Sequence, residues 1–145
     1  ANGLAFSADR RWMYTSDTPN AVIYRTPLDE QGEPGRREVF RRFQPGEGIP
    51  DGAAIDVEGG YWSAMFDGWR IARFSPQGEA LESYPMPVRC PTMVCFGGAD
   101  MKTLYITTTR ENMEDDELAQ YPLSGAIFTL PVAVAGMKKL PFREC

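Results

Sequence analysis

The residues of this sequence that could do chemistry are carboxylates and amides, because its 145 residues include no histidine. Without histidine there is no Ser-His-Asp triad, no Cys-His pair, no histidine general base and no histidine-ligated zinc. Catalysis would therefore need carboxylates, a metal ion or both. Asn2 and Asp51 suit that chemistry. Amide and carboxylate oxygens are hard ligands for Ca²⁺, Mg²⁺ or Mn²⁺, and a carboxylate also accepts Zn²⁺.

The spacing of these two residues belongs to an internal repeat. Three segments share a pattern of small, apolar and aromatic positions: residues 1–7 (ANGLAFS), 50–56 (PDGAAID) and 91–97 (PTMVCFG). Asn2, Asp51 and Thr92 occupy matching places, although threonine is a poor metal ligand. Units repeated around an axis would bring the first two to one mouth of a central channel. Alternatively, the Asn-Gly and Asp-Gly dipeptides at these positions are hairpin turns, which they strongly favour.

The elements that must hold these residues are short β-strands. Glycine (14), proline (12) and aromatic residues (12%) are abundant, and alanine- or leucine-rich helical runs are missing, which favours an all-β chain. Further strands are predicted after each repeat start, at residues 12–15, 21–25 and 37–43, then 61–64, 70–74 and 80–84, then 104–107 and 126–130.

Four short antiparallel strands in a unit of about 40 to 50 residues are typical of a β-propeller blade. The sequence therefore predicts an all-β propeller fold with three blades, at residues 1–46, 47–88 and 89–145. A propeller closes with about four to eight blades, because each blade is buried only between neighbours. Three blades cannot close, so we expect this chain to be part of a larger ring.

Several segments together carry a family resemblance. They are residues 2–7, 49–59, 61–62, 68–74, 95–98 and 104–107, then Arg110, Met113, Leu118 and residues 125–128. In this order and spacing they resemble the second half of the senescence marker protein, regucalcin and gluconolactonase family. The resemblance covers essentially the whole chain. It implies three blades of a six-bladed propeller, with the N-terminal half of the family's domain absent.

The resemblance also implies one divalent cation (Ca²⁺, Zn²⁺, Mg²⁺ or Mn²⁺) in the channel, with Asn2 and Asp51 at two of the family's ligand positions. It implies hydrolysis of small sugar-acid lactones, with other esters as a further substrate class. The family's glutamate ligand and its substrate-contacting arginine and asparagine belong to the missing half. We therefore expect this segment alone to bind metal weakly and to be inactive.

Asp51 is the candidate for two roles, metal ligand and general base. In a metal-assisted mechanism the cation polarises the lactone carbonyl and lowers the pKa of a bound water, while a carboxylate accepts the proton. The alternative function is non-catalytic, a propeller-derived module that binds metal or a partner protein across exposed blade faces. Two copies could also pair as a homodimer and complete a ring.

The charge balance argues against other partners. A formal net charge of −5 provides no positive field for nucleic acid or for an anionic membrane surface. No apolar run approaches the roughly 20 residues that span a bilayer. Three cysteines without a CxxC motif indicate free thiols, and no targeting signal is found, so we expect a cytoplasmic protein. The sequence does not begin with methionine, and we expect its true N-terminus to be missing.

Three other features are expected to be structural. The arginines at positions 36, 37, 41 and 42 suit an outermost strand, where charge discourages pairing with another sheet. The acidic run at residues 111–117 lacks the spacing of an EF-hand and is expected to be a solvated loop or short helix. Trp12 and Trp62 are expected to pack between blades, and Trp69 is the candidate for a surface role such as sugar stacking.

Overall fold

The chain folds into three antiparallel sheets that follow one another along the sequence. The structure is a computed structural model and describes residues 1–138. The first sheet contains, in order, β1 (Asn2–Phe6), β2 (Trp12–Asp17), β3 (Val22–Pro27) and β4 (Glu38–Arg42). The second contains β5 (Ile49–Ile55), β6 (Tyr61–Phe66), β7 (Arg70–Phe74) and β8 (Ala80–Pro85). The third contains β9 (Pro91–Gly97), β10 (Thr103–Thr108) and β11 (Ile127–Pro131).

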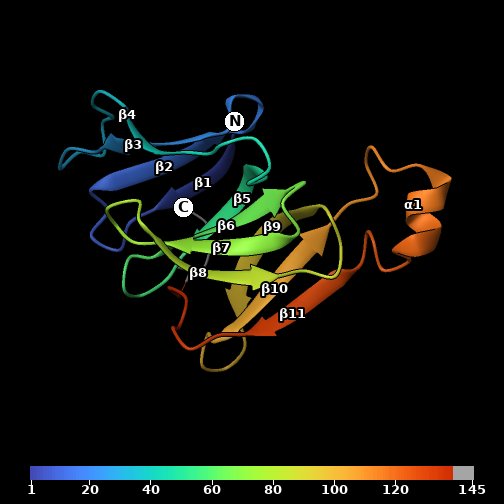
Figure 1. The fold of residues 1–145 in the computed structure, drawn as a ribbon. Coiled ribbons are helices and arrows are strands. Elements are labelled where there is room, and N and C mark those ends of the chain that lie inside the picture. Colours follow the sequence, from blue (N-terminus) through green and yellow to red (C-terminus); the bar gives the residue numbers. More distant parts are fainter. Residues whose placement is uncertain (139–145) are drawn as a thin grey trace, which may run out of the picture.

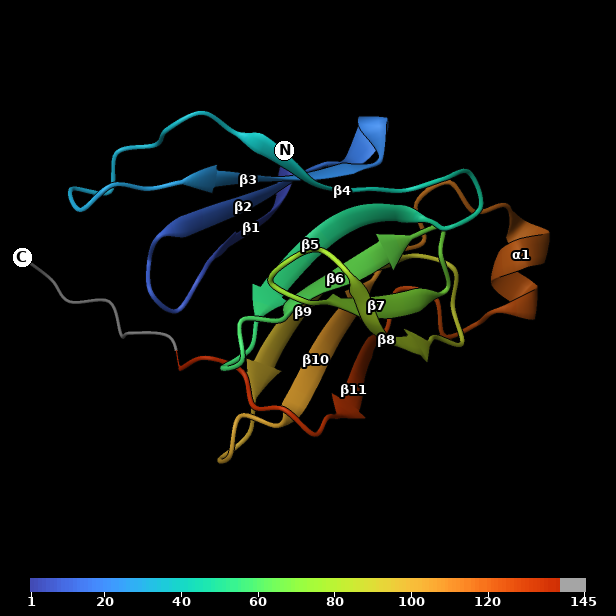
Figure 2. The same ribbon diagram turned by 60° about the vertical axis from the view of Figure 1, so that its left-hand side comes forward.

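The three sheets are arranged as blades of a β-propeller, with β1, β5 and β9 as their first strands (Figures 1 and 2). This confirms the predicted fold class and the predicted strands. In the described part of the chain, two short helices interrupt the strands, a 3-10 helix η1 (Thr18–Asn20) and an α-helix α1 (Asp115–Gln120). The helix α1 stands apart from the sheets in Figure 1 and lies in the predicted acidic run. Within residues 1–138, neither helix is long and apolar enough to cross a membrane.

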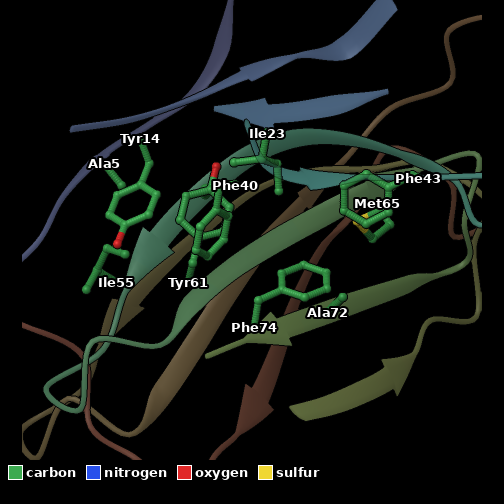
Figure 3. Close-up of a cluster of buried hydrophobic side chains, with 11 residues drawn as sticks. Ala5, Tyr14, Ile23, Phe40, Phe43, Ile55, Tyr61, Met65, Ala72 and Phe74 are labelled. Carbon is green, nitrogen blue, oxygen red and sulfur yellow. The ribbon is translucent and has the colours of Figure 1, made fainter. Parts of the chain in front are cut away.

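Aromatic side chains hold the first two sheets together (Figure 3). The Tyr14 ring lies 5.1 Å from that of Phe40 and 5.2 Å from that of Tyr61, measured between ring centroids. Farther along the interface, Phe43 packs edge-on against Phe74 at 5.6 Å. Such pairs add about 0.5–1.5 kcal/mol each beyond their burial. The cluster fixes the separation of the two sheets and therefore of β1 and β5.

Trp62 plays the same part between the second and third sheets. It is buried, stacks on Tyr84 at 5.5 Å and meets Phe96 edge-on at 5.6 Å. The prediction that Trp62 belongs to the core is confirmed. Trp12 is only half-buried at the rim of the first interface, where the guanidinium of Arg25 lies 4.4 Å from its ring centroid.

A buried ion pair between Asp56 and Arg73 lies at the end of the second sheet where β5 ends. Asp56 has no exposed surface and is saturated with hydrogen bonds. Its carboxylate accepts from the backbone N–H groups of Glu58 (2.9 Å) and Gly60 (2.8 Å), from Trp62 Nε1 (2.7 Å) and from Arg73 Nε (2.7 Å). Sequence reasoning did not single out this pair.

Arg73 is surrounded by three carboxylates. Besides Asp56, its guanidinium contacts Glu58 at 2.8 Å and Glu82 at 3.1 Å. Burial alone would lower the pKa of Arg73, but the hydrogen bonds to these carboxylates raise it, so the side chain stays charged. The pair thus joins the end of β5 to β7.

The last described segment returns to the second sheet. Gly136 forms a β-bridge with Asp56, and its N–H donates to the carbonyl of Met101 at 2.8 Å. A side chain at Gly136 would run into the ring of Phe96. The segment around Gly136 therefore ties the third sheet to the second, close to Asp56.

The arginine cluster only partly follows its prediction. β4 is the edge strand of the first sheet, as expected, and Arg37 lies on Tyr24 of the neighbouring strand, 4.2 Å from the ring centroid. Arg41, however, crosses to the second sheet, where it stacks over Phe74 at 4.7 Å and donates to the carbonyl of Gly78 at 2.8 Å. For Arg41 the interpretation as a charge guarding the edge is wrong, because this long side chain packs between sheets.

Candidate functional site

The structure brings the three repeat starts together at one end of the sheets. A methyl group at Gly3, next to Asn2, would lie 2.9 Å from the carbonyl oxygen of Asp51. In the same way, a methyl group at Gly52 would lie 2.6 Å from the carbonyl oxygen of Thr92. The starts of β1, β5 and β9 are therefore adjacent. Asn2 and Asp51 therefore lie on neighbouring strands, β1 and β5, as the repeat predicts.

The alternative reading of the Asn-Gly and Asp-Gly dipeptides as hairpin turns is wrong. Asn2 and Asp51 both lie within strands, and the register with the next strand shifts between Asn2 and Ala5 and between Pro50 and Ala53. Gly3 adopts a φ of +58°, which glycine reaches without strain. The repeat thus uses glycine to make an irregularity at the strand start, a device that often re-aims a side chain beside a functional site.

Gly3 also lies where no side chain fits. The hydroxyl of Tyr61 donates to the Gly3 carbonyl at 2.9 Å and lies 3.2 Å from the hydroxyl of Ser16. Both hydroxyls would overlap a methyl group at this position. Burial raises the pKa of Tyr61, so its hydroxyl keeps the proton that it donates to Gly3. The buried hydroxyls of Tyr61 and Ser16 therefore hold the backbone beside Asn2 in place.

We predict that Gly3→Ala destabilises the chain by about 2–3 kcal/mol, from about 1–2 kcal/mol of backbone strain plus overpacking. Urea unfolding would measure this loss. The matched control is Gly32→Ala, since Gly32 also has a positive φ (+83°) but has open space around it. Equal losses in the two variants would contradict the steric part of the argument.

Asn2 is held by the connection that follows β2. Its side-chain Nδ2 donates to Thr18 Oγ1 at 3.0 Å, and Thr18 Oγ1 in turn donates to the Pro50 carbonyl at 2.7 Å. Pro50 immediately precedes Asp51, so this chain of hydrogen bonds links the two candidate ligands. Sequence reasoning missed Thr18, because nothing in a Thr-Pro dipeptide indicates a contact 32 residues away.

Asp51 is a half-buried carboxylate that accepts no side-chain hydrogen bond from residues 1–138. Burial raises the pKa of Asp51, and the negative charge of Glu111, from the connection between β10 and β11, raises it further. Both effects disfavour the ionised form. A bound cation would reverse them, so the donor set of Asn2 and Asp51 fits a hard divalent ion.

Two oxygen donors are too few for such an ion. Ca²⁺ takes six to eight oxygen ligands. The third repeat start contributes nothing evident, because the hydroxyl of Thr92 is paired with that of Thr107 at 2.8 Å. Across residues 1–138, no three His, Cys, Asp or Glu side chains are grouped closely enough to hold a metal ion.

A polar cluster holds the loops together at the end of the sheets where β1, β5 and β9 begin. Arg89 pairs with Glu117 of α1 at 2.6 Å and also contacts Asp67 in the turn between β6 and β7. Trp69, the expected surface aromatic, packs edge-on against Tyr121 at 4.8 Å. The acidic run is therefore partly anchored, and Trp69 serves as packing for α1.

Comparison with known protein families identifies the family of this chain. A family model described as the SMP-30/Gluconolactonase/LRE-like region matches residues 1–110. The chain belongs to this family. The resemblance first noted in the repeat starts is thereby confirmed.

Individual members of the SMP-30/gluconolactonase family extend the match. A 6-deoxy-6-sulfogluconolactonase from Pseudomonas putida is 58% identical over 137 residues, which are 94% of this chain and 47% of the relative. Regucalcin of Danio rerio is 38% identical over 144 residues, 97% of this chain and 48% of the relative. The chain thus spans about half the length of these curated relatives.

A solved family structure shows the same fold. The crystal structure of a calcium-binding protein, regucalcin, from Agrobacterium tumefaciens superimposes with a TM-score of 0.92 at 32% identity. The match covers 99% of this chain and 49% of the regucalcin chain. The three sheets therefore have the arrangement of half of that family member.

Proposed function

We propose that this chain is the metal-bearing half of a six-bladed, divalent-metal-dependent lactonase. The observation that carries the proposal is the adjacency of Asn2 and Asp51, an amide and a desolvated carboxylate at one end of the sheets. Coverage of about half of each lactonase relative supports the six-bladed ring, in which the remaining ligands would come from the other half.

The substrate class that we propose is a sugar-acid lactone. The 58% identical relative is a 6-deoxy-6-sulfogluconolactonase, so 6-deoxy-6-sulfogluconolactone is the first substrate to test. D-Glucono-1,5-lactone is the second, and a simple aryl ester the third. The relative's name supports the choice of class, whereas residues 1–138 identify no contact to a particular sugar.

Asn2 and Asp51 would hold the cation, which when bound supplies Lewis acidity toward a lactone carbonyl and lowers the pKa of water. Asn2 contributes a neutral oxygen whose position is fixed by Thr18. Asp51 contributes a negative one. We propose that Asp51 also accepts the proton that water loses on attacking the carbonyl, since its half-buried carboxylate is carried by the strand next to that of Asn2.

The second proposal is a non-catalytic or self-associating module. It rests on exposed apolar side chains. Leu4 and Phe6 of β1 are 60% and 47% exposed, and Ile127 of β11 is 69% exposed. These side chains belong to the first and last sheets, so another half-propeller would cover them. A second copy of this chain could do so and form a homodimeric ring. The free thiols of Cys90 and Cys95 support a reducing, cytoplasmic setting for either assembly.

One experiment tests the proposed function. The 145-residue chain is assayed for lactone hydrolysis alone and after co-expression with the N-terminal half of the Pseudomonas putida relative. We expect the chain alone to be inactive and the co-expressed halves to hydrolyse lactone. EDTA should abolish this turnover, and excess Ca²⁺, Mn²⁺ or Zn²⁺ should restore it.

The controls distinguish a homodimeric ring of this chain from a ring formed with the other half. Spontaneous lactone hydrolysis is subtracted at every pH, and each sample's mass is measured by light scattering. Metal-dependent turnover by a dimer of the chain alone would favour the homodimeric ring. Turnover of the co-expressed halves that survives EDTA would contradict the metal-dependent mechanism.

A further inference from the structure

The hydroxyl of Thr18 can form hydrogen bonds with both of its neighbours in only one way. Its oxygen lies 2.7 Å from the carbonyl oxygen of Pro50 and 3.0 Å from the side-chain amide of Asn2. A carbonyl oxygen can only accept, so the single hydroxyl proton of Thr18 must point to Pro50. What Thr18 offers to Asn2 is therefore a lone pair.

This direction determines which end of the Asn2 amide faces which way. The oxygen and nitrogen of an asparagine amide have almost the same shape, so hydrogen bonding decides their placement. A lone pair on Thr18 selects the NH₂ group of Asn2. The amide oxygen, Oδ1, is left as the free end, and it accepts no side-chain hydrogen bond from residues 1–138.

We propose that Thr18 is a positioning residue, which fixes the Asn2 amide with Oδ1 available to a divalent cation. This inference rests on the proposed metal site. Through Pro50, the same hydroxyl ties Asn2 to the strand that carries Asp51. The two candidate ligands are thereby held to one another across the boundary between the first and second sheets.

The arrangement also explains why an amide, and not a second carboxylate, stands at position 2. An ionised aspartate has no proton to donate, so it would present lone pairs to the lone pairs of Thr18. To pair with it, Thr18 would have to withdraw its proton from Pro50. The hydroxyl thus selects one neutral and one negative oxygen ligand for the site.

The experiment compares Thr18→Val, which keeps the shape but removes the hydroxyl, with Thr18→Ser, which keeps the hydroxyl. Thr15→Val is the matched control, since Thr15 is a half-buried threonine of β2 whose hydroxyl makes no side-chain hydrogen bond within residues 1–138. In the metal-free, ¹⁵N-labelled 145-residue chain, the Nδ2 protons of Asn2 are followed by NMR. Their signals are assigned by their loss in Asn2→Asp.

We expect Thr18→Val to move the hydrogen-bonded Nδ2 proton of Asn2 to the position of an exposed asparagine amide. Thr18→Ser and Thr15→Val should leave it in place. Titration with Mn²⁺, read as paramagnetic broadening around residues 2 and 51, should give a dissociation constant about tenfold weaker in Thr18→Val, as is typical when the outer partner of a metal ligand is lost. Thr18→Ser should stay within about twofold of the parent chain.

The two readouts separate this inference from the function on which it rests. If the Asn2 signals of Thr18→Val match those of the parent chain, the positioning role of Thr18 is wrong. An equal loss of Mn²⁺ affinity in Thr15→Val would also overturn it. If Mn²⁺ broadens these signals neither in the parent chain nor in the co-expressed halves, the proposed metal site fails, and the metal-free amide signals still decide whether Thr18 orients Asn2.

Discussion

Replacing Asp56 with alanine is expected to cost about 3–5 kcal/mol, because removing one partner of a buried ion pair strands the other charge. Arg73 would keep only Glu58 and Glu82, both of which reach it from the solvent side. The Trp62 indole N–H would also lose its acceptor. Small domains have about 5–15 kcal/mol of stability, so this loss is a large share of the total, and the variant should unfold at a much lower urea concentration than the parent.

Urea unfolding followed by tryptophan fluorescence measures this effect, since Trp62 contacts the pair directly. Glu58→Gln is the control. Glu58 also contacts Arg73, at 2.8 Å, but its side chain is 64% exposed. An exposed ion pair contributes about 1 kcal/mol or less. If both variants lost the same stability, the importance that we assign to burial of Asp56 would be wrong.

Asp51→Asn is expected to lower metal-dependent lactone hydrolysis by about a thousandfold, or about 4 kcal/mol of transition-state stabilisation. The variant loses both the negative ligand and the proton acceptor. The fold should not suffer, because the Asp51 carboxylate is partly desolvated and receives no side-chain hydrogen bond from the described residues. The measurement is turnover of the co-expressed halves at saturating metal.

The matched control is Asp116→Asn, an exposed acid on α1 in the connection that also contains Glu111. It removes the same charge from the same end of the sheets and should change turnover less than about twofold. Circular dichroism melting of the 145-residue chain should show Asp51→Asn to be as stable as the parent. Retention of full activity in Asp51→Asn would remove Asp51 from both of its proposed roles.

The sheet architecture and the placement of Asn2 and Asp51 on neighbouring strands could be predicted because both follow from repetition. Equivalent positions of successive blades fall at one end of neighbouring sheets, whatever their distance along the sequence. Local propensity alone was misleading. Asn-Gly and Asp-Gly favour hairpin turns, but here their glycines allow close approach and an irregular strand start, as Gly3 shows with its φ of +58°.

The long-range contacts of the sheets and of the site could not be predicted, since they connect groups whose meeting depends on tertiary packing. Arg73 reaches Asp56 across three strands of the second sheet, and Thr18 reaches Pro50 from the neighbouring sheet. Arg41 looked like an edge charge because its strand is an edge. Its guanidinium instead follows the apolar surface to Phe74.

The bridge between Gly136 and Asp56 has a consequence for folding during synthesis. These residues are 80 positions apart in the sequence. At about 5–20 residues per second, the ribosome needs roughly 4–16 seconds to make the intervening chain. During that interval Asp56 lacks its bridge partner, Gly136. We therefore expect nascent chains to be open to proteolysis next to Asp56, and this part of the sheet to be protected only once the segment around Gly136 has emerged.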